Sequence, residues 1–313
     1  MKTERVTFHS EGARLHGFLH LPDTARERMP FVVQGPGWLG LADAKLYVPY
    51  HEAFTAAGFA VLIFDYRGFG ESEGDRAIAP MGQVADWRNA IAYMRGRDDV
   101  DPERGAIFGS GGTGGGNAVL VAADEPEIHA TISQVPIADG RDWLRRMRAS
   151  EDEWVAFLQA VEADRRRRAA TGNGTSVHPR EGIMVESAER RASAVKSDVD
   201  ARIPSSVPLA DAQRVLDYRP IDAAPRVRGL LVVAVEDDGV TPTDHARRLY
   251  DVAGEPKKLL LQRGTTHYAA YKQYAGEVIP RMVDWLRRLV VDRGRMPQAA
   301  TVEHIGEPAR TPA

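Results

Sequence analysis

Short apolar runs alternate with segments of helical periodicity along most of the chain, and this alternation limits the possible folds more than any other feature. The expected strands are 31–34, 60–65, 105–108, 130–135, 230–235 and 257–261, and the expected helices are 45–57, 82–95, 114–123, 243–253 and 269–291. Apolar strands that alternate with helices are typical of a parallel sheet covered on both faces. We therefore expect an α/β fold with a mostly parallel central sheet. Residues 5–21 alternate around Glu11-Gly12 and predict an edge hairpin.

The alternation stops between residues 139 and 224, where no strand is evident and stretches such as 143–168 have helical periodicity. An excursion of this kind at the carboxyl edge of a parallel sheet is well placed to cover a site. We predict a helical cap at 139–224, inserted between core segments 1–138 and 225–293. The tail, 294–313, is rich in Pro, Ala and charge, and we expect it to be disordered or loosely attached.

Three aromatic residues of the insertion, Trp143, Trp154 and Phe157, are candidates for lining a substrate pocket. Aromatic residues at helical spacing more often pack within a core, so both interpretations stay open.

Composition narrows the classes of partner. The 41 basic and 44 acidic residues nearly balance, so no overall positive field attracts nucleic acid or an anionic membrane. The chain has no cysteine, which excludes disulfides and thiolate metal sites. No stretch has the roughly 20 apolar residues of a membrane span, and the residues after Met1 do not resemble a signal peptide. We expect a cytoplasmic protein with a small-molecule partner, no cofactor and no metal. Homo-oligomer formation stays open.

The most specific motif is 105–117, a strand that ends in a glycine-rich turn and continues into a helix. In a nucleophile elbow, small residues stand two before the nucleophile and two or three after it. With Gly109 as the leading small residue, the nucleophile position is Gly111. Ser110 fits poorly, because the bulky Phe108 would stand two residues before it. A phosphate-binding turn is the alternative, but the Gly-Lys-Ser/Thr ending is absent and the dinucleotide spacing matches only weakly.

Three other motifs follow strands of the expected sheet. They are the glycine loop within 31–40, the segment Asp65-Tyr-Arg-Gly-Phe-Gly-Glu-Ser72, and the acidic loop 236–242 followed by Leu259 to His267. Together with the turn at Gly111, they resemble the α/β-hydrolase superfamily of serine hydrolases, which includes esterases, dienelactone-hydrolase-like proteins and S15 peptidases. The resemblance implies an α/β-hydrolase fold with a helical cap.

The resemblance also implies roles in Ser-His-Asp acyl transfer. Gly111 occupies the nucleophile position, His267 is the expected base, and Asp238 is the expected acid. The neighbouring Asp237 is the less favoured acid, because alignment on Pro242 selects Asp238. In the Asp65 motif, we expect Asp65 and Arg67 to satisfy one another and nearby backbone groups, since a buried charge must be paired.

The same resemblance assigns the oxyanion hole to the backbone N–H groups of Trp38 and Gly112. Pro36 stands where the superfamily usually has histidine, and it has no N–H to donate. Trp38 does have one, so the register of this loop is chemically consistent.

Glycine at 111 has no side-chain nucleophile, so no acyl-enzyme can form there. One interpretation is a serine hydrolase for an ester-type, amide or lactone bond, inactivated by replacement of its serine. The intact Asp238 and His267 favour this interpretation. The alternatives are a natural ligand-binding protein of the same fold, a C–C bond hydrolase, and activation of water by His267 directly.

Overall fold

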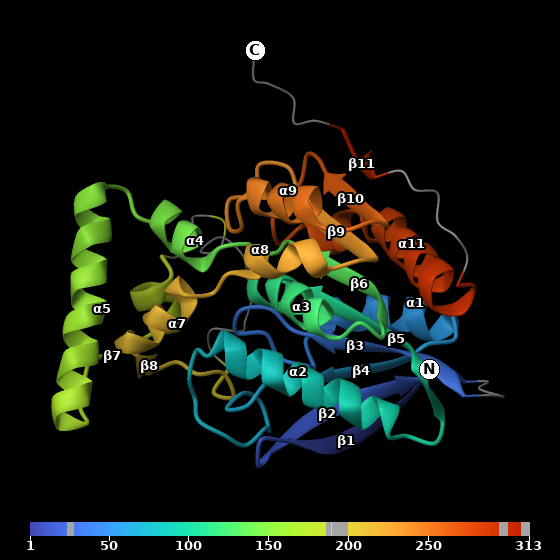
Figure 1. Ribbon diagram of the computed structural model, residues 1–313, viewed down its shortest axis with the longest axis horizontal. Coiled ribbons are helices and arrows are strands. Elements are labelled where there is room, and N and C mark those ends of the chain that lie inside the picture. Colours follow the sequence, from blue (N-terminus) through green and yellow to red (C-terminus); the bar gives the residue numbers. More distant parts are fainter. Residues whose placement is uncertain (24–27, 186–188, 190–199, 294–299, 308–313) are drawn as a thin grey trace.

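The computed structural model describes residues 1–23, 28–185, 189, 200–293 and 300–307. In this part of the chain, nine strands form one sheet with the order β1-β2-β4-β3-β5-β6-β9-β10-β11. The pairs β1–β2 and β2–β4 are antiparallel, and every other neighbouring pair is parallel. Helices cover both faces (Figure 1). The mostly parallel sheet expected from the alternation is confirmed.

The strands of this sheet are β1 (Lys2–Ser10), β2 (Ala13–Leu21), β3 (Met29–Gly35), β4 (Ala60–Phe64), β5 (Val100–Ser110), β6 (Ile128–Gln134), β9 (Leu230–Val235), β10 (Lys257–Gln262) and β11 (Thr301–Ile305). The helices and helical turns outside the insertion are η1 (Lys45–Tyr47), α1 (Val48–Ala56), α2 (Pro80–Arg95), α3 (Gly112–Asp124), η5 (Ala224–Arg226), α9 (Thr243–Val252), α10 (Ala270–Gln273), α11 (Ala275–Leu286) and η6 (Arg287–Val291). The insertion contains α4 (Gly140–Arg146), α5 (Glu151–Thr171), β7 (Ser176–Val177), η2 (Pro179–Ile183), β8 (Val207–Pro208), η4 (Leu209–Asp211), α7 (Ala212–Leu216) and α8 (Pro220–Ala223).

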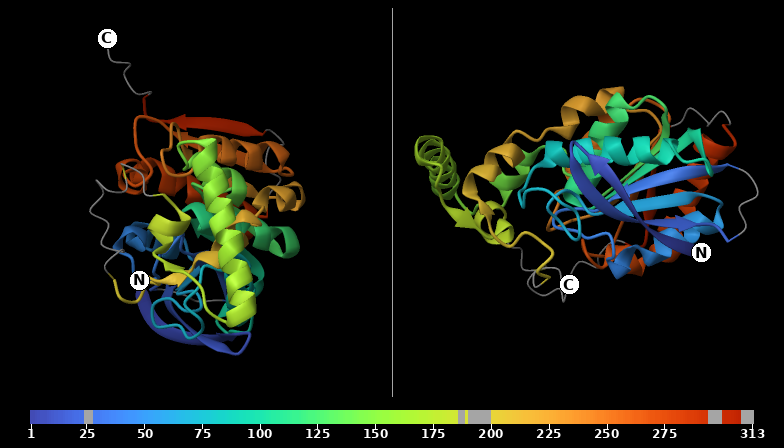
Figure 2. Two further views of the ribbon diagram at one scale, coloured as in Figure 1. Left: turned by 90° about the vertical axis from the view of Figure 1, so that its left-hand side faces the viewer. Right: turned by 90° about the horizontal axis from the view of Figure 1, so that it is seen from below.

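The core lies on both faces of the sheet. On one face, Phe54 of α1 and Trp285 of α11 are buried in a cluster with sheet residues. On the opposite face, Trp87 of α2 packs on the sheet. Helices α3 and α9 cover the same face as α2 (Figure 2). Because helices cover both faces, strands such as β4 are buried along their whole length. This explains why these strands appear in the sequence as continuous apolar runs.

The end of the chain contradicts one expectation. Residues 301–305 form β11, which pairs in parallel with β10, and Ile305 is only 1% exposed. Glu303 of this strand forms an ion pair with Lys258 at 2.6 Å. The expectation of a disordered or loosely attached tail is therefore wrong for residues 300–307. A short segment of this kind forms a strand only when the edge strand of a sheet is available to pair with it. Its own sequence therefore gives little indication of a strand. The rest of 294–313 lies outside the described residues.

The insertion and the last helix also differ in detail from the expectation. The two short strands β7 and β8 pair antiparallel within 139–224, where none was evident, because a two-residue strand is too short to show alternation. The helix expected over 269–291 is divided at Tyr274 into α10 and α11, followed by the π-helical turn η6. Part of the insertion, 186–188 and 190–199, lies outside the described residues.

The expected pairing of Asp65 with Arg67 is wrong, but the expected contact of Asp65 with nearby backbone is confirmed. Asp65 accepts a hydrogen bond from the backbone N–H of Ala42 at 2.8 Å. Arg67 donates instead to Asp86, a fully buried residue of α2, with Nε at 2.9 Å and Nη2 at 2.6 Å. The Arg67 backbone N–H donates to the same carboxylate at 3.0 Å. The sequence motif therefore anchors the β4 loop to α2.

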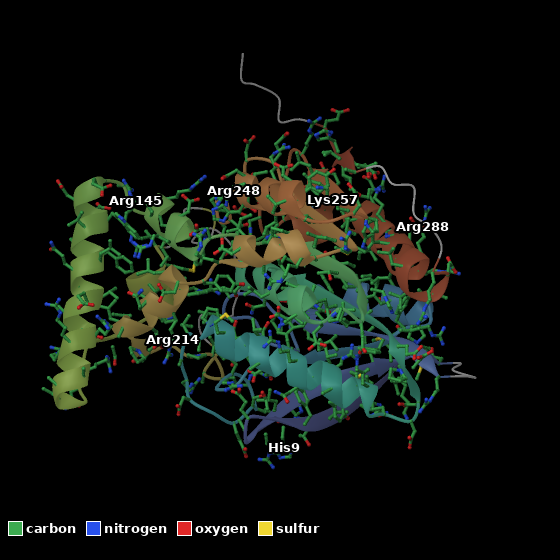
Figure 3. The ribbon with its side chains drawn as sticks, viewed as in Figure 1. His9, Arg145, Arg214, Arg248, Lys257 and Arg288 are labelled. Carbon is green, nitrogen blue, oxygen red and sulfur yellow. The ribbon has the colours of Figure 1, made fainter. Side chains whose placement is uncertain are left out.

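Cationic side chains are spread over the surface of the molecule. Those labelled in Figure 3 include Arg145 on α4, Arg214 on α7, Arg248 on α9 and Arg288 on η6, and they do not gather on one element. None of the helices in the described ranges is both long and apolar enough to cross a bilayer.

Candidate active site

Gly111 lies between β5 and α3, at the carboxyl edge of the centre of the sheet, with φ +78° and ψ 167°. This backbone conformation belongs almost only to glycine. The glycines around it are packed as an elbow requires. A Cβ on Gly109 would lie 2.0 Å from the carbonyl oxygen of Gly114, and a Cβ on Gly114 would lie 2.6 Å from that of Pro36. Small residues are therefore needed at 109 and 114, and this supports the register that puts 111 at the apex of the turn.

The glycine loop after β3 approaches Gly111 closely. A Cβ added to Gly111 would lie 2.9 Å from the Cα atom of Gly37 and 3.8 Å from the hydroxyl of Tyr271. A side chain at 111 therefore requires the backbone of the elbow or of the glycine loop to shift.

Asp238 and His267 come together beside this turn. Asp238 follows β9, His267 follows β10, and His267 Nδ1 lies 2.8 Å from Asp238 Oδ2. The other carboxylate oxygen accepts hydrogen bonds from the backbone N–H groups of Val240 at 2.7 Å and Thr241 at 2.8 Å. These contacts fix the carboxylate in place. With Nδ1–H donating to Asp238, Nε2 of His267 is left as a proton acceptor.

The environment keeps Asp238 ionised. Burial of its side chain, which is 1% exposed, opposes ionisation, but the nearby His267 ring and the donors of Thr241 and Val240 outweigh it and lower the pKa of Asp238. Asp237 is exposed and has φ +58°. The contact with His267 is therefore made by Asp238.

A cavity of about 670 Å³ lies over Gly111. Among the residues that line it are Trp38, Gly111, Gly112, Trp143 and His267. Five of the eight residues proposed from the sequence therefore meet in one space, and Asp238 lies directly behind His267. Residues of the insertion, among them Met184, line the same cavity.

The three insertion aromatics lie in different places. Trp143 of α4 packs edge-on against Trp38 with ring centroids 5.4 Å apart, and its Nε1 donates to the carbonyl of Val240 at 2.9 Å. Trp154 and Phe157 of α5 are not among the residues that line the cavity. They stack on one another at 5.9 Å, and the Arg148 guanidinium lies 3.7 Å above Phe157. These two aromatic residues pack within the insertion.

Residues 11–268 match the X-Pro dipeptidyl-peptidase (S15 family). The chain belongs to the S15 family. Among curated proteins, it is 29% identical over 249 residues to an uncharacterized 31.7 kDa protein in the traX-finO intergenic region of Escherichia coli, covering 78% of this chain and 85% of the relative. Over 137 residues it is 38% identical to the quorum-quenching protein AidA of Acinetobacter baumannii (strain MDR-ZJ06), covering 43% of this chain and 44% of that protein.

The structure is similar to that of the α/β hydrolase GrgF from Penicillium sp. sh18, with a TM-score of 0.76 and 20% identity, covering 93% of this chain and 99% of that chain. The α/β-hydrolase fold expected from the sequence motifs is thereby confirmed. The S15 family indicates a protein of the hydrolase type.

In this S15-family chain, sequence reasoning missed the tyrosine at the back of the site. Tyr271 lines the cavity, and its hydroxyl accepts a hydrogen bond from Ser110 Oγ at 3.2 Å. A weak signal was present, because Tyr271 follows His267 by four residues, the spacing of one helical turn.

Away from the cavity, Asp142, Asp244 and His245 offer ligand atoms that lie within 4.8 Å of one another. The guanidinium of Arg146 already binds both carboxylates, at 2.9 Å to Asp142 and 2.7 Å to Asp244. His245 Nε2 is 2.8 Å from Asp142. A cationic side chain therefore occupies the place of a metal ion, and this group is better described as an ion-pair cluster between α4 and α9.

Proposed function

We propose that the cavity over Gly111 is an acyl-compound site of the esterase type, which holds the carbonyl group of an ester, amide or lactone. In it, His267 is the base and Asp238 orients its ring. The backbone N–H groups of Trp38 and Gly112 are the oxyanion donors. The observation that carries the proposal is the 2.8 Å hydrogen bond between His267 and Asp238, in the wall of a cavity that also contains the elbow glycine.

As it stands, the chain has no side-chain nucleophile at 111, so we propose that it binds such a compound without forming an acyl-enzyme. Two origins compete. An inactivated serine hydrolase explains the retained Asp238 and His267. A dedicated binding protein agrees better with the close approach of the glycine loop, since a Cβ at 111 would meet Gly37 Cα at 2.9 Å.

Replacement of Gly111 separates the two origins. In an inactivated hydrolase, Gly111→Ser should react covalently with a fluorophosphonate probe at position 111, whereas the unmodified chain should not, because only serine offers a hydroxyl to the phosphorus. Gly111→Ala is the matched control, since it adds the same Cβ and the same crowding against Gly37 without a nucleophile. Intact-mass and peptide mass spectrometry measure the adduct.

If Gly111→Ser stays unlabelled and inactive towards ester, amide and lactone substrates, while the unmodified chain binds an acyl compound, the dedicated binding protein is the better description. Loss of binding to acyl compounds in both forms would contradict the proposed site itself.

We also propose that residues 139–224 act as the cap that sets ligand preference. Support comes from α4, where Trp143 packs against Trp38 and donates to Val240, and from Met184, which also lines the cavity.

In the Gly111→Ser chain, Trp143→Leu is expected to change the ratio of KM values for 4-nitrophenyl octanoate and acetate by about 10-fold, because the indole contributes apolar wall to the cavity. The kcat ratio should change less. Trp154→Leu is the control, since it removes an indole of the same insertion that does not line the cavity. Equal effects of the two changes on the KM ratio would contradict this role.

A further inference from the structure

Three buried hydroxyl groups meet behind Gly111. Ser110, the last residue of β5, is fully buried, and its Oγ donates to the hydroxyl of Tyr271 on α10 at 3.2 Å. The side chain of Tyr47, on η1, is buried nearby, and the adjoining Ser110 hydroxyl and Gly37 backbone partly oppose the rise of its pKa to about 12 that burial causes. The cluster therefore connects both sides of the elbow, the glycine loop after β3 and the end of β5, to the helix that follows His267.

The direction of the hydrogen bond between Ser110 and Tyr271 leaves the Tyr271 hydroxyl as a potential donor to the cavity. A serine hydroxyl has one proton, and Ser110 gives it to Tyr271. Tyr271 accepts in this contact and keeps its own proton for another acceptor. Burial raises the pKa of Tyr271 well above its ordinary value, so the phenol stays protonated through the neutral range.

The Tyr271 hydroxyl lies where a ligand bound over Gly111 can reach it. It is 3.8 Å from the position that a Cβ on Gly111 would take. Tyr271 also lines the cavity together with Gly111 and His267, and its ring centroid is 6.5 Å from that of His267. The protonated hydroxyl of Tyr271 thus lies beside Gly111, which has no hydroxyl of its own.

We infer that Tyr271 is a ligand-contacting residue whose hydroxyl donates a hydrogen bond to an oxygen of the acyl group held over Gly111. Ser110 and Tyr47 are positioning residues, since they hold the Tyr271 hydroxyl and the glycine loop in register. The inference rests on the proposed function, because it needs an acyl ligand in this cavity.

The test compares two ligands that differ in the carbonyl group, 4-nitrophenyl acetate and its ether analogue 4-nitrophenetole. Quenching of tryptophan fluorescence reports their binding to the unmodified Gly111 chain, since Trp38 and Trp143 line the cavity. The unmodified chain is expected to prefer the ester. Tyr271→Phe should weaken ester binding by about 5- to 10-fold, the typical effect of one hydrogen bond, and leave ether binding unchanged.

Ser110→Ala should weaken ester binding less, by about 2-fold, because it loosens the donor without removing it. Tyr274→Phe is the matched control, since that hydroxyl donates to the carbonyl of Arg263 at 2.8 Å and Tyr274 is not among the cavity-lining residues. It should leave both affinities unchanged.

Different results would overturn the role of Tyr271 and the acyl-compound site itself. If Tyr271→Phe keeps the full preference for the ester, the role of Tyr271 is overturned and the acyl site stands. If the unmodified chain shows no preference for the ester over the ether, the acyl site is overturned, and the role of Tyr271 with it.

Discussion

In a chain carrying Gly111→Ser, His267→Ala is expected to lower kcat by several orders of magnitude, and Asp238→Asn by about 10⁴-fold. The reason for the second effect lies in the hydrogen bond of 2.8 Å between His267 Nδ1 and Asp238 Oδ2. An amide at 238 would offer an N–H to Nδ1 and favour the wrong tautomer of the imidazole. Steady-state hydrolysis of a 4-nitrophenyl ester measures the change.

Asp237→Asn is the control for this prediction, because the side chain next to Asp238 is exposed. It should change kcat by less than about 3-fold, as expected for a surface residue outside the reacting groups. If Asp237→Asn were the more damaging change, the acid would be Asp237 and the register of the loop would be off by one residue.

The pH range of this effect follows from the Asp238 carboxylate. Its pKa lies below the ordinary value, so it stays ionised and available to His267 throughout the neutral and mildly acidic range. On acidification of the Gly111→Ser chain, protonation of Asp238 is therefore not expected to limit activity until the pH falls below the ordinary pKa of an aspartate.

Arg67→Met is expected to lower the free energy of unfolding by about 3–5 kcal/mol, the usual cost of removing one partner of a buried ion pair. The Asp86 side chain has an exposed fraction of 0%, and two guanidinium N–H groups of Arg67 donate to it. Without Arg67, the carboxylate is left buried with only the backbone donor at 67. Urea denaturation followed by circular dichroism measures the loss.

A matched control lies on α2, the helix that carries Asp86. Arg88 pairs with Asp124 at 2.6 Å, but the two side chains are 41% and 47% exposed. Solvent screens such a pair, so Arg88→Met should cost no more than about 1 kcal/mol. Adding Asp86→Asn to Arg67→Met should restore part of the lost stability, because the unpaired charge is gone. Equal costs for Arg67→Met and Arg88→Met would contradict the buried-pair explanation.

The sequence by itself determined the layered fold and the order of the chemical motifs. Strands buried on both faces must be apolar throughout, and this made β3, β4, β5, β9 and β10 visible as short runs between helices. The elbow was equally visible, since the close contacts of Gly109 and Gly114 leave room for no side chain. Features that depend on residues adjacent in the chain can therefore be predicted from the sequence.

Tertiary structure alone decided the details that depend on partners distant in the chain. β11 is a strand because β10 offers it an edge, although its own residues are mostly exposed. Arg67 pairs with Asp86 and not Asp65 because α2 crosses beside the β4 loop. In the same way, the packing of α4 and α5 decided that Trp143 lines the cavity and Trp154 does not. Helical spacing shows which residues share a face of a helix, but it does not show what that face contacts.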